Sequence, residues 1–294
     1  MKKRSIAIIC FFVFTFAHAA NDRAFVWRVS SDTAIVYLVG SIHFADKSFY
    51  PLRPEIEKAF AGCDNLVVEL NVNKIDADVY NSLLSKKGVY KDGKTIKDVI
   101  SEKTWLQLQK RLNLLSINYD AVKHYRPGVL VLTLSAMQAM QMGFDPQLGI
   151  DVHFLLEASR QEKNIVELET LEQQINLFLN VPDGELLLQE SLYSLDESES
   201  MMADMVRYWK QGDEAQMVKL LFEDAIEDYP AFGEIYDRLF YERNRQMISK
   251  INAMLSKKSA EKMCHFVVVG SGHLLGEQGI VNALKEKGYM IKRF

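Results

Sequence analysis

The sequence predicts an α/β fold in which a mixed, mostly parallel sheet is built from N-terminal and C-terminal βαβ units, with a large helical insertion between them. Two observations support this prediction. Short apolar runs at residues 34–39 and 266–269, both closed by glycine, are typical of buried strands. Each run is followed by apolar residues at helical spacing and by a second strand pattern, whereas residues from about 71 to 258 are mainly helical in pattern.

The first 19 residues predict a cleaved signal peptide. Three basic residues at positions 2–4 precede an apolar run over residues 6–16, and Ala17, His18 and Ala19 fit a small-x-small cleavage site. The apolar run is too short to span a bilayer. We therefore expect residues 20–294 to form a single domain in the periplasm or outside the cell.

Composition narrows the class of partner. Loss of the three basic residues with the leader takes the net charge from −4 to −7. A mildly acidic exported protein is a poor nucleic-acid binder, because phosphate recognition needs clustered basic residues. Since no later stretch approaches transmembrane length, we expect no membrane span after cleavage and a peptide or small molecule as substrate.

The first unit begins with an expected hairpin. Extended patterns at residues 25–29 and 34–39 flank the polar residues 30–33. Apolar positions at helical spacing over 52–60 then predict a helix, and residues 66–70 predict a second buried strand.

The insertion, about residues 71–258, is expected to be helical apart from one strand. The predicted elements are a helix near 104–115, an apolar helix over 129–142, a helix from 149, a strand at 164–168, and helices from 171 to 258. The second unit follows, with a strand at 266–269, a helix through Ile280 and Leu284, and a strand at 289–291.

A Gly-x-x-His motif follows the first strand of each unit, as Gly40 to His43 and as Gly270 to His273. Ligands of open parallel sheets bind beyond the carboxyl ends of the strands. We therefore interpret the two motifs as halves of one site. The alternative is that each histidine is a loop residue bonded to a backbone carbonyl.

Two further residues point to metal chemistry. Glu69 interrupts an apolar strand near its carboxyl end, and Arg243 falls within the apolar stripe of a helix. Two histidines and one glutamate are the ligands of an open catalytic site for a divalent ion, so His43, Glu69 and His273 are the expected ligands of Zn, Mn, Co or Fe. Glu69 and Arg243 are the catalytic candidates, with Arg243 stabilising an oxyanion or binding a substrate carboxylate.

Two simpler interpretations stay open. Glu69 and Arg243 could form a structural ion pair, because a buried arginine needs an anionic partner. Ser41 and Ser271 could suggest a serine nucleophile, but the sequence contains no Gly-x-Ser-x-Gly elbow.

Cys63 and Cys264 each stand just before a predicted strand, at the end of the sheet opposite the histidines. Export permits a disulfide, which would join the two terminal units if their strands are neighbours. The alternative is two buried free thiols.

Together these residues resemble the TraB/GumN family, which is related to the Tiki proteins and to bacterial pheromone-shutdown proteins. The resemblance covers nearly the whole chain after the leader. It is carried by both Gly-x-x-His motifs and by Val68–Leu70, Gly149–Asp151, Glu167–Thr170 and Arg243–Asn244.

The resemblance implies a metal-dependent hydrolase, and some family members are described as proteases of secreted signalling peptides. It implies that His43 and His273 bind the metal, that Glu69 is a ligand or general base, and that Asp151 and Glu169 support these groups. We expect an exported hydrolase that cleaves amide bonds of peptides or proteins through a metal-activated water. The alternative is a non-catalytic binding protein that sequesters a peptide, haem or metal.

Overall fold

The computed structural model describes residues 22–257 and 262–294. The predicted signal peptide at residues 1–19 lies outside the described residues. Among those that are described, no helix combines the length and the apolar character needed to cross a membrane.

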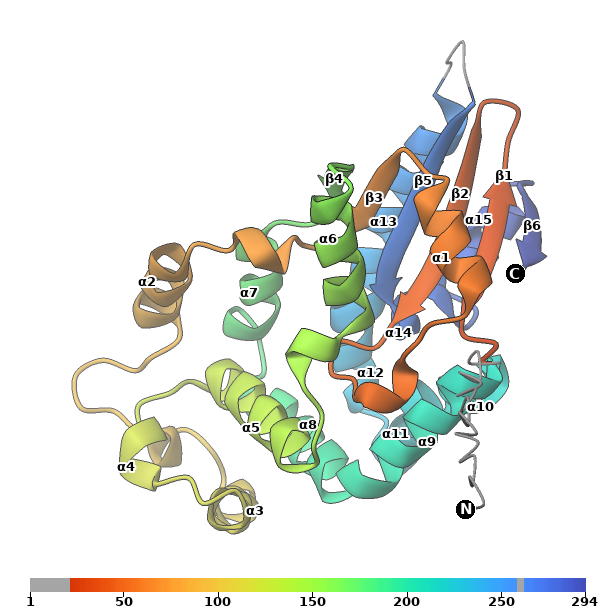
Figure 1. The fold of residues 1–294 in the computed structure, drawn as a ribbon. Helices are drawn as coiled ribbons and strands as arrows, with labels where there is room; N and C mark the ends of the chain where they lie inside the picture. Colours follow the sequence, from red (N-terminus) through yellow and green to blue (C-terminus); the bar gives the residue numbers. More distant parts are fainter. Residues whose placement is uncertain (1–21, 258–261) are drawn as a thin grey trace, which may run out of the picture.

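Six strands form one sheet in the order β4-β3-β5-β2-β1-β6 (Figure 1). Their bounds are β1 Val26–Ser30, β2 Ala34–Ser41, β3 Asn65–Val68, β4 Asn164–Glu167, β5 Met263–Gly270 and β6 Met290–Arg293. The pairs β2–β5, β3–β5 and β3–β4 are parallel, and β1 pairs antiparallel with β2 and β6. The predicted mixed, mostly parallel sheet is confirmed, as is the N-terminal hairpin.

The two terminal units are interleaved in the sheet. β5 lies between β2 and β3, which are the two strands of the first unit, and β6 pairs with β1 instead of β5. The strand that carries the second histidine motif therefore lies directly beside both strands of the first unit. This arrangement brings residues more than 200 positions apart to one end of the sheet.

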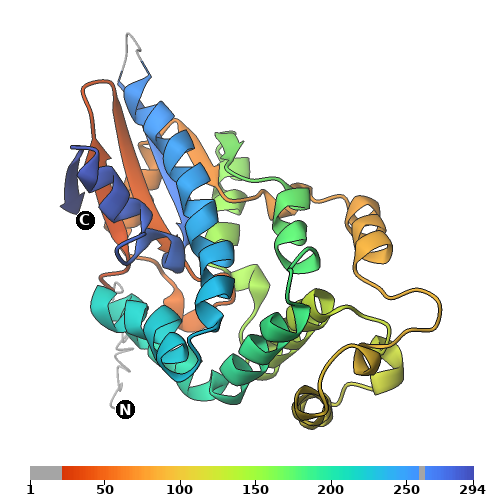
Figure 2. The same cartoon turned by 180° about the vertical axis from the view of Figure 1, so that it is seen from behind.

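Helices cover both faces of the sheet. The α-helices are α1 Pro54–Ala61, α2 Ala77–Lys87, α3 Glu102–Leu114, α4 Tyr119–Val122, α5 Pro127–Gln141, α6 Ile150–Arg160, α7 Leu171–Leu179, α8 Gly184–Asp196, α9 Ser198–Gln211, α10 Glu214–Val218, α11 Asp224–Asp228, α12 Phe232–Tyr236, α13 Glu242–Ser256, α14 Ser271–Leu274 and α15 Ile280–Glu286. Helices α1 and α6 lie on one face, and α13 and α15 lie on the other (Figures 1 and 2).

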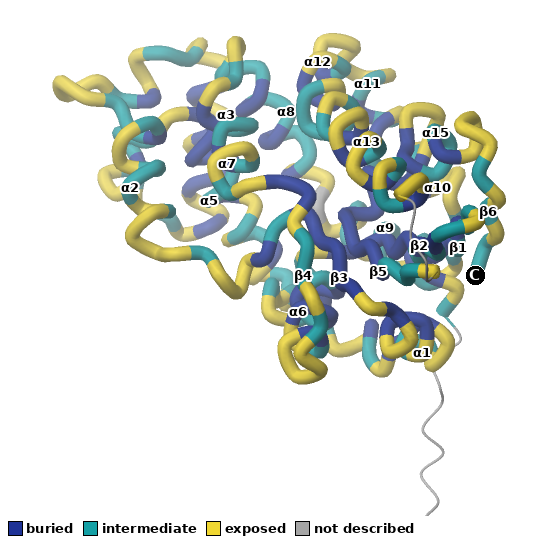
Figure 3. The backbone as a smooth tube through the Cα atoms, turned by 90° about the horizontal axis from the view of Figure 1, so that it is seen from above, coloured by how far each residue is buried: buried dark blue, intermediate teal, exposed yellow. Residues whose placement is uncertain are grey.

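Burial follows this layering. Seen from above, the central strands β2, β3 and β5 are buried between the two helical layers (Figure 3). The apolar runs of β3 and β5 have no exposed residue, as expected for parallel strands covered on both faces. Edge strand β4 is less buried because it has a single neighbour in the sheet.

Helices α3, α5 and α8 of the insertion lie beside the sheet (Figure 1). They contribute to a hydrophobic cluster that is separate from the core of the sheet. Trp105, Leu108, Leu130 and Leu188 from α3, α5 and α8 are among its buried members. The insertion also contributes α6 and β4 to the sheet layers, so it is attached to the α/β core by packing as well as by chain connection.

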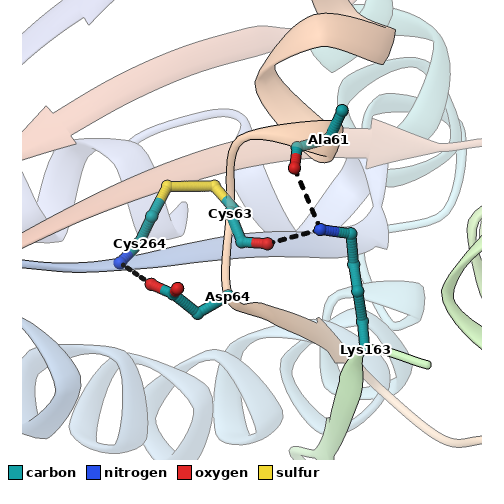
Figure 4. Close-up of a disulfide and its surroundings, with 5 residues drawn as sticks. All are labelled: Ala61, Cys63, Asp64, Lys163 and Cys264. Atoms are coloured by element: carbon teal, nitrogen blue, oxygen red, sulfur yellow. Dashed lines mark hydrogen bonds between the residues drawn. A yellow bond between two sulfur atoms is a disulfide. The ribbon is translucent and has the colours of Figure 1, made fainter. Parts of the chain in front are cut away.

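A disulfide joins Cys63 and Cys264 at the end of the sheet opposite the histidine motifs (Figure 4). Cys63 immediately precedes Asp64, whose side chain accepts a hydrogen bond from the Cys264 backbone N–H at 2.9 Å. Lys163 Nζ donates to the Cys63 carbonyl at 2.6 Å and to the Ala61 carbonyl at 3.1 Å. The bridge therefore ties β3 to its neighbour β5, across 201 positions of sequence.

Candidate active site

The candidate site lies at the carboxyl ends of β2, β3 and β5. His43 follows the end of β2 by two residues, Glu69 follows β3 directly, and His273 lies in the short helix α14 after β5. The two Gly-x-x-His motifs are offset by one position, because Ser41 rather than Gly40 pairs with Gly270. The structure thus brings the three expected ligands to one place. The two motifs differ in conformation, because only the second continues directly into a helix.

One oxygen of Glu69 lies between the two imidazoles. Glu69 Oε1 is 3.9 Å from His43 Nε2 and 3.8 Å from His273 Nε2. The same oxygen accepts a 2.6 Å hydrogen bond from the Gly270 backbone N–H. A Cβ atom at Gly270 would lie 3.2 Å from His43 Nε2 and 3.4 Å from Glu69 Oε1, so glycine keeps the space between these groups open.

His43 is oriented by the start of α6. Its Nδ1 donates to Asp151 Oδ2 at 3.1 Å, and Ser41 Oγ donates to Asp151 Oδ1 at 2.9 Å. Partial burial alone would lower the pKa of His43, but Asp151 and then Glu69 outweigh it and raise that pKa to about 9. The His43 side chain is 51% exposed, so it is the accessible member of the pair.

Gly149 permits this approach of the His43 loop to α6. A Cβ at Gly149 would lie 2.6 Å from the His43 carbonyl oxygen, and the Ile150 N–H donates to the Ile42 carbonyl at 3.2 Å. A side chain at position 149 would push the loop away from the helix. The Gly149–Ile150–Asp151 sequence therefore places the Asp151 carboxylate against the His43 ring.

His273 is fully buried and differs in protonation from His43. Its Nδ1 is 2.7 Å from Asn244 Oδ1, and burial lowers the pKa of His273 to about 4. The imidazole is therefore neutral at pH 7. Its Nε2 faces Glu69 with an unshared electron pair.

Arg243 and two carboxylates form a buried cluster behind the histidines. Arg243 Nη2 donates to Glu69 Oε2 at 2.5 Å, and Nε and Nη2 contact the Glu169 carboxylate at 2.8 and 2.7 Å. Burial raises the pKa of Glu69, but His273, His43 and Arg243 together lower it to about 2. Glu69 is thus ionised at any pH at which the protein is expected to work.

The contacts of Arg243 favour the ion-pair alternative for this residue. In addition to the two carboxylates, Arg243 Nη1 donates to the Leu239 carbonyl at 2.9 Å. A guanidinium has five N–H groups, and within the described chain these contacts occupy four of them. Arg243 therefore orients Glu69 and Glu169, and little of it is left to bind an oxyanion.

Three contributors to the site were not identified from the sequence. Asn244 holds His273, Ser41 holds Asp151, and Gln174 Nε2 donates to Glu169 Oε2 at 3.0 Å. Asn244 belongs to the Arg243–Asn244 pair, but its role depends on a contact with α14 that no local pattern indicates. Gln174 lies in the first turn of α7, which Thr170 caps directly after Glu169.

Two cavities border the candidate site, and both are lined in part by His43 and Arg243. One has a volume of about 460 Å³ and is lined on the insertion side by the segment after β3, by residues 146–147 and by α7. The other has a volume of about 320 Å³ and is lined by residues of α9, α10 and α14. His43, Phe44 and Arg243 border both cavities, whereas Glu69 borders only the first and His273 only the second, so both cavities reach the histidine–glutamate centre.

The donor atoms can be compared with the requirements of a metal ion. As positioned, the described residues contain no group of three or more His, Cys, Asp or Glu side chains close enough to hold one. Zinc binds nitrogen and oxygen at about 2.0–2.2 Å, almost always with tetrahedral geometry, which places two donors of one ion about 3.4 Å apart. The separations of 3.9 and 3.8 Å are longer than this, and both histidines have the Nδ1 partner typical of metal-binding imidazoles. The donor types of the three residues suit a divalent ion, and the side chains would have to move closer together to bind it.

The fold and the site define an α/β protein with a His–Glu–His centre at the carboxyl ends of parallel strands. The model of the TraB/PrgY/gumN family matches residues 25–293, and the chain belongs to that family.

Relatives include bacterial and animal proteins. Uncharacterized protein YbaP of Escherichia coli is 26% identical over 85% of this chain and 87% of its own length. Metalloprotease TIKI2 of Xenopus tropicalis is 21% identical over 92% of this chain, and a metalloprotease TIKI homolog of Amphimedon queenslandica is 23% identical over 93%. The matches span 59% and 62% of those two longer proteins. No solved structure matches the chain.

Proposed function

We propose that this protein is an exported, metal-dependent hydrolase that cleaves amide bonds of peptides or proteins. The observation that carries the proposal is the position of Glu69 Oε1 between the Nε2 atoms of two histidines, each oriented through its Nδ1 atom. Such oriented imidazoles together with a carboxylate are the protein part of a catalytic metal site.

His43, Glu69 and His273 would hold the ion, which could be Zn, Mn, Co or Fe. When bound, such an ion lowers the pKa of a coordinated water toward about 7 and polarises a carbonyl group. In hydrolysis, water adds across the C–N bond and yields a carboxylate and an amine. If Glu69 is not a ligand of the ion, its carboxylate would be the general base that accepts the proton of the attacking water.

The remaining residues keep this geometry fixed. Asp151 and Asn244 orient the two imidazoles, while Arg243 and the Gly270 N–H orient the Glu69 carboxylate. Preorganised groups of this kind reduce the rearrangement needed during reaction. The two flanking cavities offer space for the chain on both sides of a scissile bond.

Two further observations support the proposal. The matching TIKI relatives are named metalloproteases. Export is supported by the sequence of residues 1–19 and by the Cys63–Cys264 bridge, because disulfides persist in oxidising compartments.

The test uses purified mature protein and a mixture of internally quenched peptides. Cleavage should be lost with a chelator and restored by adding back Zn, Mn, Co or Fe singly. Glu69→Gln should abolish cleavage while retaining peptide binding, and Glu172→Gln, an exposed glutamate of α7, should remain active. Tight binding of peptide, haem or metal without a cleavage product under any metal would instead identify a sequestering protein.

A further inference from the structure

The cavity of about 320 Å³ beside the histidines has a distinct chemical character. Part of its lining consists of apolar side chains from α9, from α10, and from two π-helical segments, one after α10 and one after α12. These residues are Met202, Met205, Met217, Leu221 and Phe240. We refer to this set as the methionine pocket.

The methionine pocket is continuous with the candidate catalytic centre. The same cavity is bordered by His43, Gly270 and His273. Phe240 forms the junction, because its ring centroid lies 5.3 Å from that of His273. A Cβ at Gly272 would lie 2.7 Å from Phe240 Cε1, so glycine at this position allows the ring to pack against the site.

Two π-helical segments border the pocket. They are η5 Lys219–Glu223, which supplies Leu221, and η6 Asp237–Tyr241, which supplies Phe240. π-helical turns are rare and occur frequently at functional sites, because they change the direction of side chains. The carbonyl of Leu239, also in η6, accepts a hydrogen bond from Arg243, so η6 positions both the pocket wall and the ion-pair cluster.

Charge is distributed unevenly around this cavity. His43, Arg243 and His273 lie where the cavity meets the catalytic centre, and the five residues of the methionine pocket have no charge. Methionine side chains adapt to ligands of different shape, which suits a range of apolar groups. The volume is at the small end of the range for ligand pockets, so one large side chain is the appropriate occupant.

The second cavity, of about 460 Å³, shares His43 and Arg243 with the first but is otherwise lined by other segments of the chain. It is bordered by Asn73, Gln147 and Gln174, whose amides can form hydrogen bonds with a peptide backbone. A peptide whose scissile bond lies at the histidines would therefore place one side chain in the methionine pocket and continue through this second cavity.

We propose that the methionine pocket determines specificity, by binding a large apolar side chain (Leu, Met or Phe) of the residue adjacent to the cleaved bond. This inference rests on the proposed hydrolase function. A charged side chain in the same position would lose its hydration without gaining a partner, and the pocket would reject it.

The experiment uses metal-loaded mature protein and internally quenched peptides that differ only in one residue beside the cleaved bond (Ala, Leu, Met, Phe or Asp). Wild-type kcat/KM should be at least about tenfold higher for Leu, Met and Phe than for Ala, and lowest for Asp. Met202→Trp, which fills the pocket, should lower kcat/KM for the Leu, Met and Phe peptides at least about tenfold relative to wild type and so remove this preference. Met201→Trp is the matched control, because the neighbouring Met201 borders a different cavity.

Leu221→Ala provides an independent variant that enlarges the pocket. It should shift the preference from Leu toward Phe. The inference is wrong if the wild type cleaves without an apolar preference, or if Met202→Trp and Leu221→Ala leave that preference unchanged. In either case the hydrolase proposal stands, provided that Glu69→Gln is inactive. If metal-loaded wild type cleaves no peptide, or Glu69→Gln cleaves as wild type does, the hydrolase proposal fails and this inference fails with it.

Discussion

Asn244 and His273 are joined by a hydrogen bond that determines which nitrogen of the imidazole carries the proton. Asn244 Nδ2 donates to the Gln278 carbonyl at 2.9 Å, which turns Oδ1 toward His273 Nδ1. An amide oxygen can only accept, so Nδ1 must carry the proton. Nε2 is then left with its electron pair directed toward Glu69, 3.8 Å away.

Asn244→Ala should therefore weaken metal binding. Loss of the Nδ1 partner frees the ring to rotate, and removal of such partners typically lowers metal affinity about 10- to 100-fold. Titration with a competing chromophoric chelator measures the affinity. Gln246→Ala, at an exposed position of the same helix, should bind metal as wild type does. Equal affinities for the two variants would contradict the role assigned to Asn244.

Gly270→Ala should impair the site without destabilising the fold. The backbone at Gly270 has φ −50° and ψ 138°, which alanine adopts readily. The added methyl group would lie 3.2 Å from His43 Nε2 and 3.4 Å from Glu69 Oε1. Displacement of catalytic groups by about 1 Å can reduce rates about 100-fold.

Peptide cleavage and thermal unfolding should be measured together for this variant. Gly233→Ala in α12 is the matched control, because a Cβ there meets no atom within 4 Å. Full activity in Gly270→Ala would show that the space between the histidines and Glu69 is not used.

Arg243→Gln should destabilise the protein. Glu69 and Glu169 would both lose their cationic partner in a buried setting, and breaking a buried ion pair costs about 3–5 kcal/mol. Urea unfolding monitored by circular dichroism measures the change in the free energy of unfolding. Arg245→Gln, two positions along on the exposed side of α13, should change stability by less than about 1 kcal/mol. A stable Arg243→Gln protein would mean that the two carboxylates find other partners.

Replacing both cysteines by serine should lower stability while sparing catalysis. The bridge closes a loop across 201 positions, and loss of such a link costs about 2–5 kcal/mol. It lies at the opposite end of the sheet from the histidines, so the folded variant should retain wild-type kcat/KM. Reduction of the wild type with dithiothreitol should reproduce the stability loss and leave the double serine variant unaffected.

Glu190 should make stability depend on pH. Burial raises the pKa of this carboxyl above its ordinary range, although Ser194 and Tyr236 donate hydrogen bonds to Oε1. A raised pKa in the folded state means that stability is fully present below the unfolded pKa and is lost as pH rises through the folded pKa. As pH rises from about 4.5 to the folded-state pKa of Glu190, the free energy of unfolding of Glu190→Gln should therefore increase relative to that of the wild type. A difference between the two proteins that is constant from pH 4 to 8 would contradict this.

Local patterns in the sequence were sufficient for most of the secondary structure. The apolar runs before Gly40 and Gly270 form parallel strands, and β5 ends at its glycine as predicted, whereas β2 continues through Gly40 to Ser41. The interruption of an apolar strand by Glu69 and the position of Arg243 in an apolar stripe indicated buried charges, which the structure contains. These features are visible because strand and helix periodicity depend on neighbours in sequence.

Contacts across the fold were not accessible in this way. The placement of β5 between β2 and β3, the contact of Asn244 with His273 and the methionine pocket depend on segments that are far apart in sequence. The distances in sequence between these segments follow no helix or strand period, so no local pattern predicts their contacts.

The sequence by itself determined the strands, the helices and the three side chains that were expected to meet. Only the tertiary structure decided that His43 is half exposed, that His273 is buried and neutral, and that Arg243 is engaged with two carboxylates. The physical reason is that burial and charge pairing are properties of the packed environment. That environment is created when sheet order brings distant segments together.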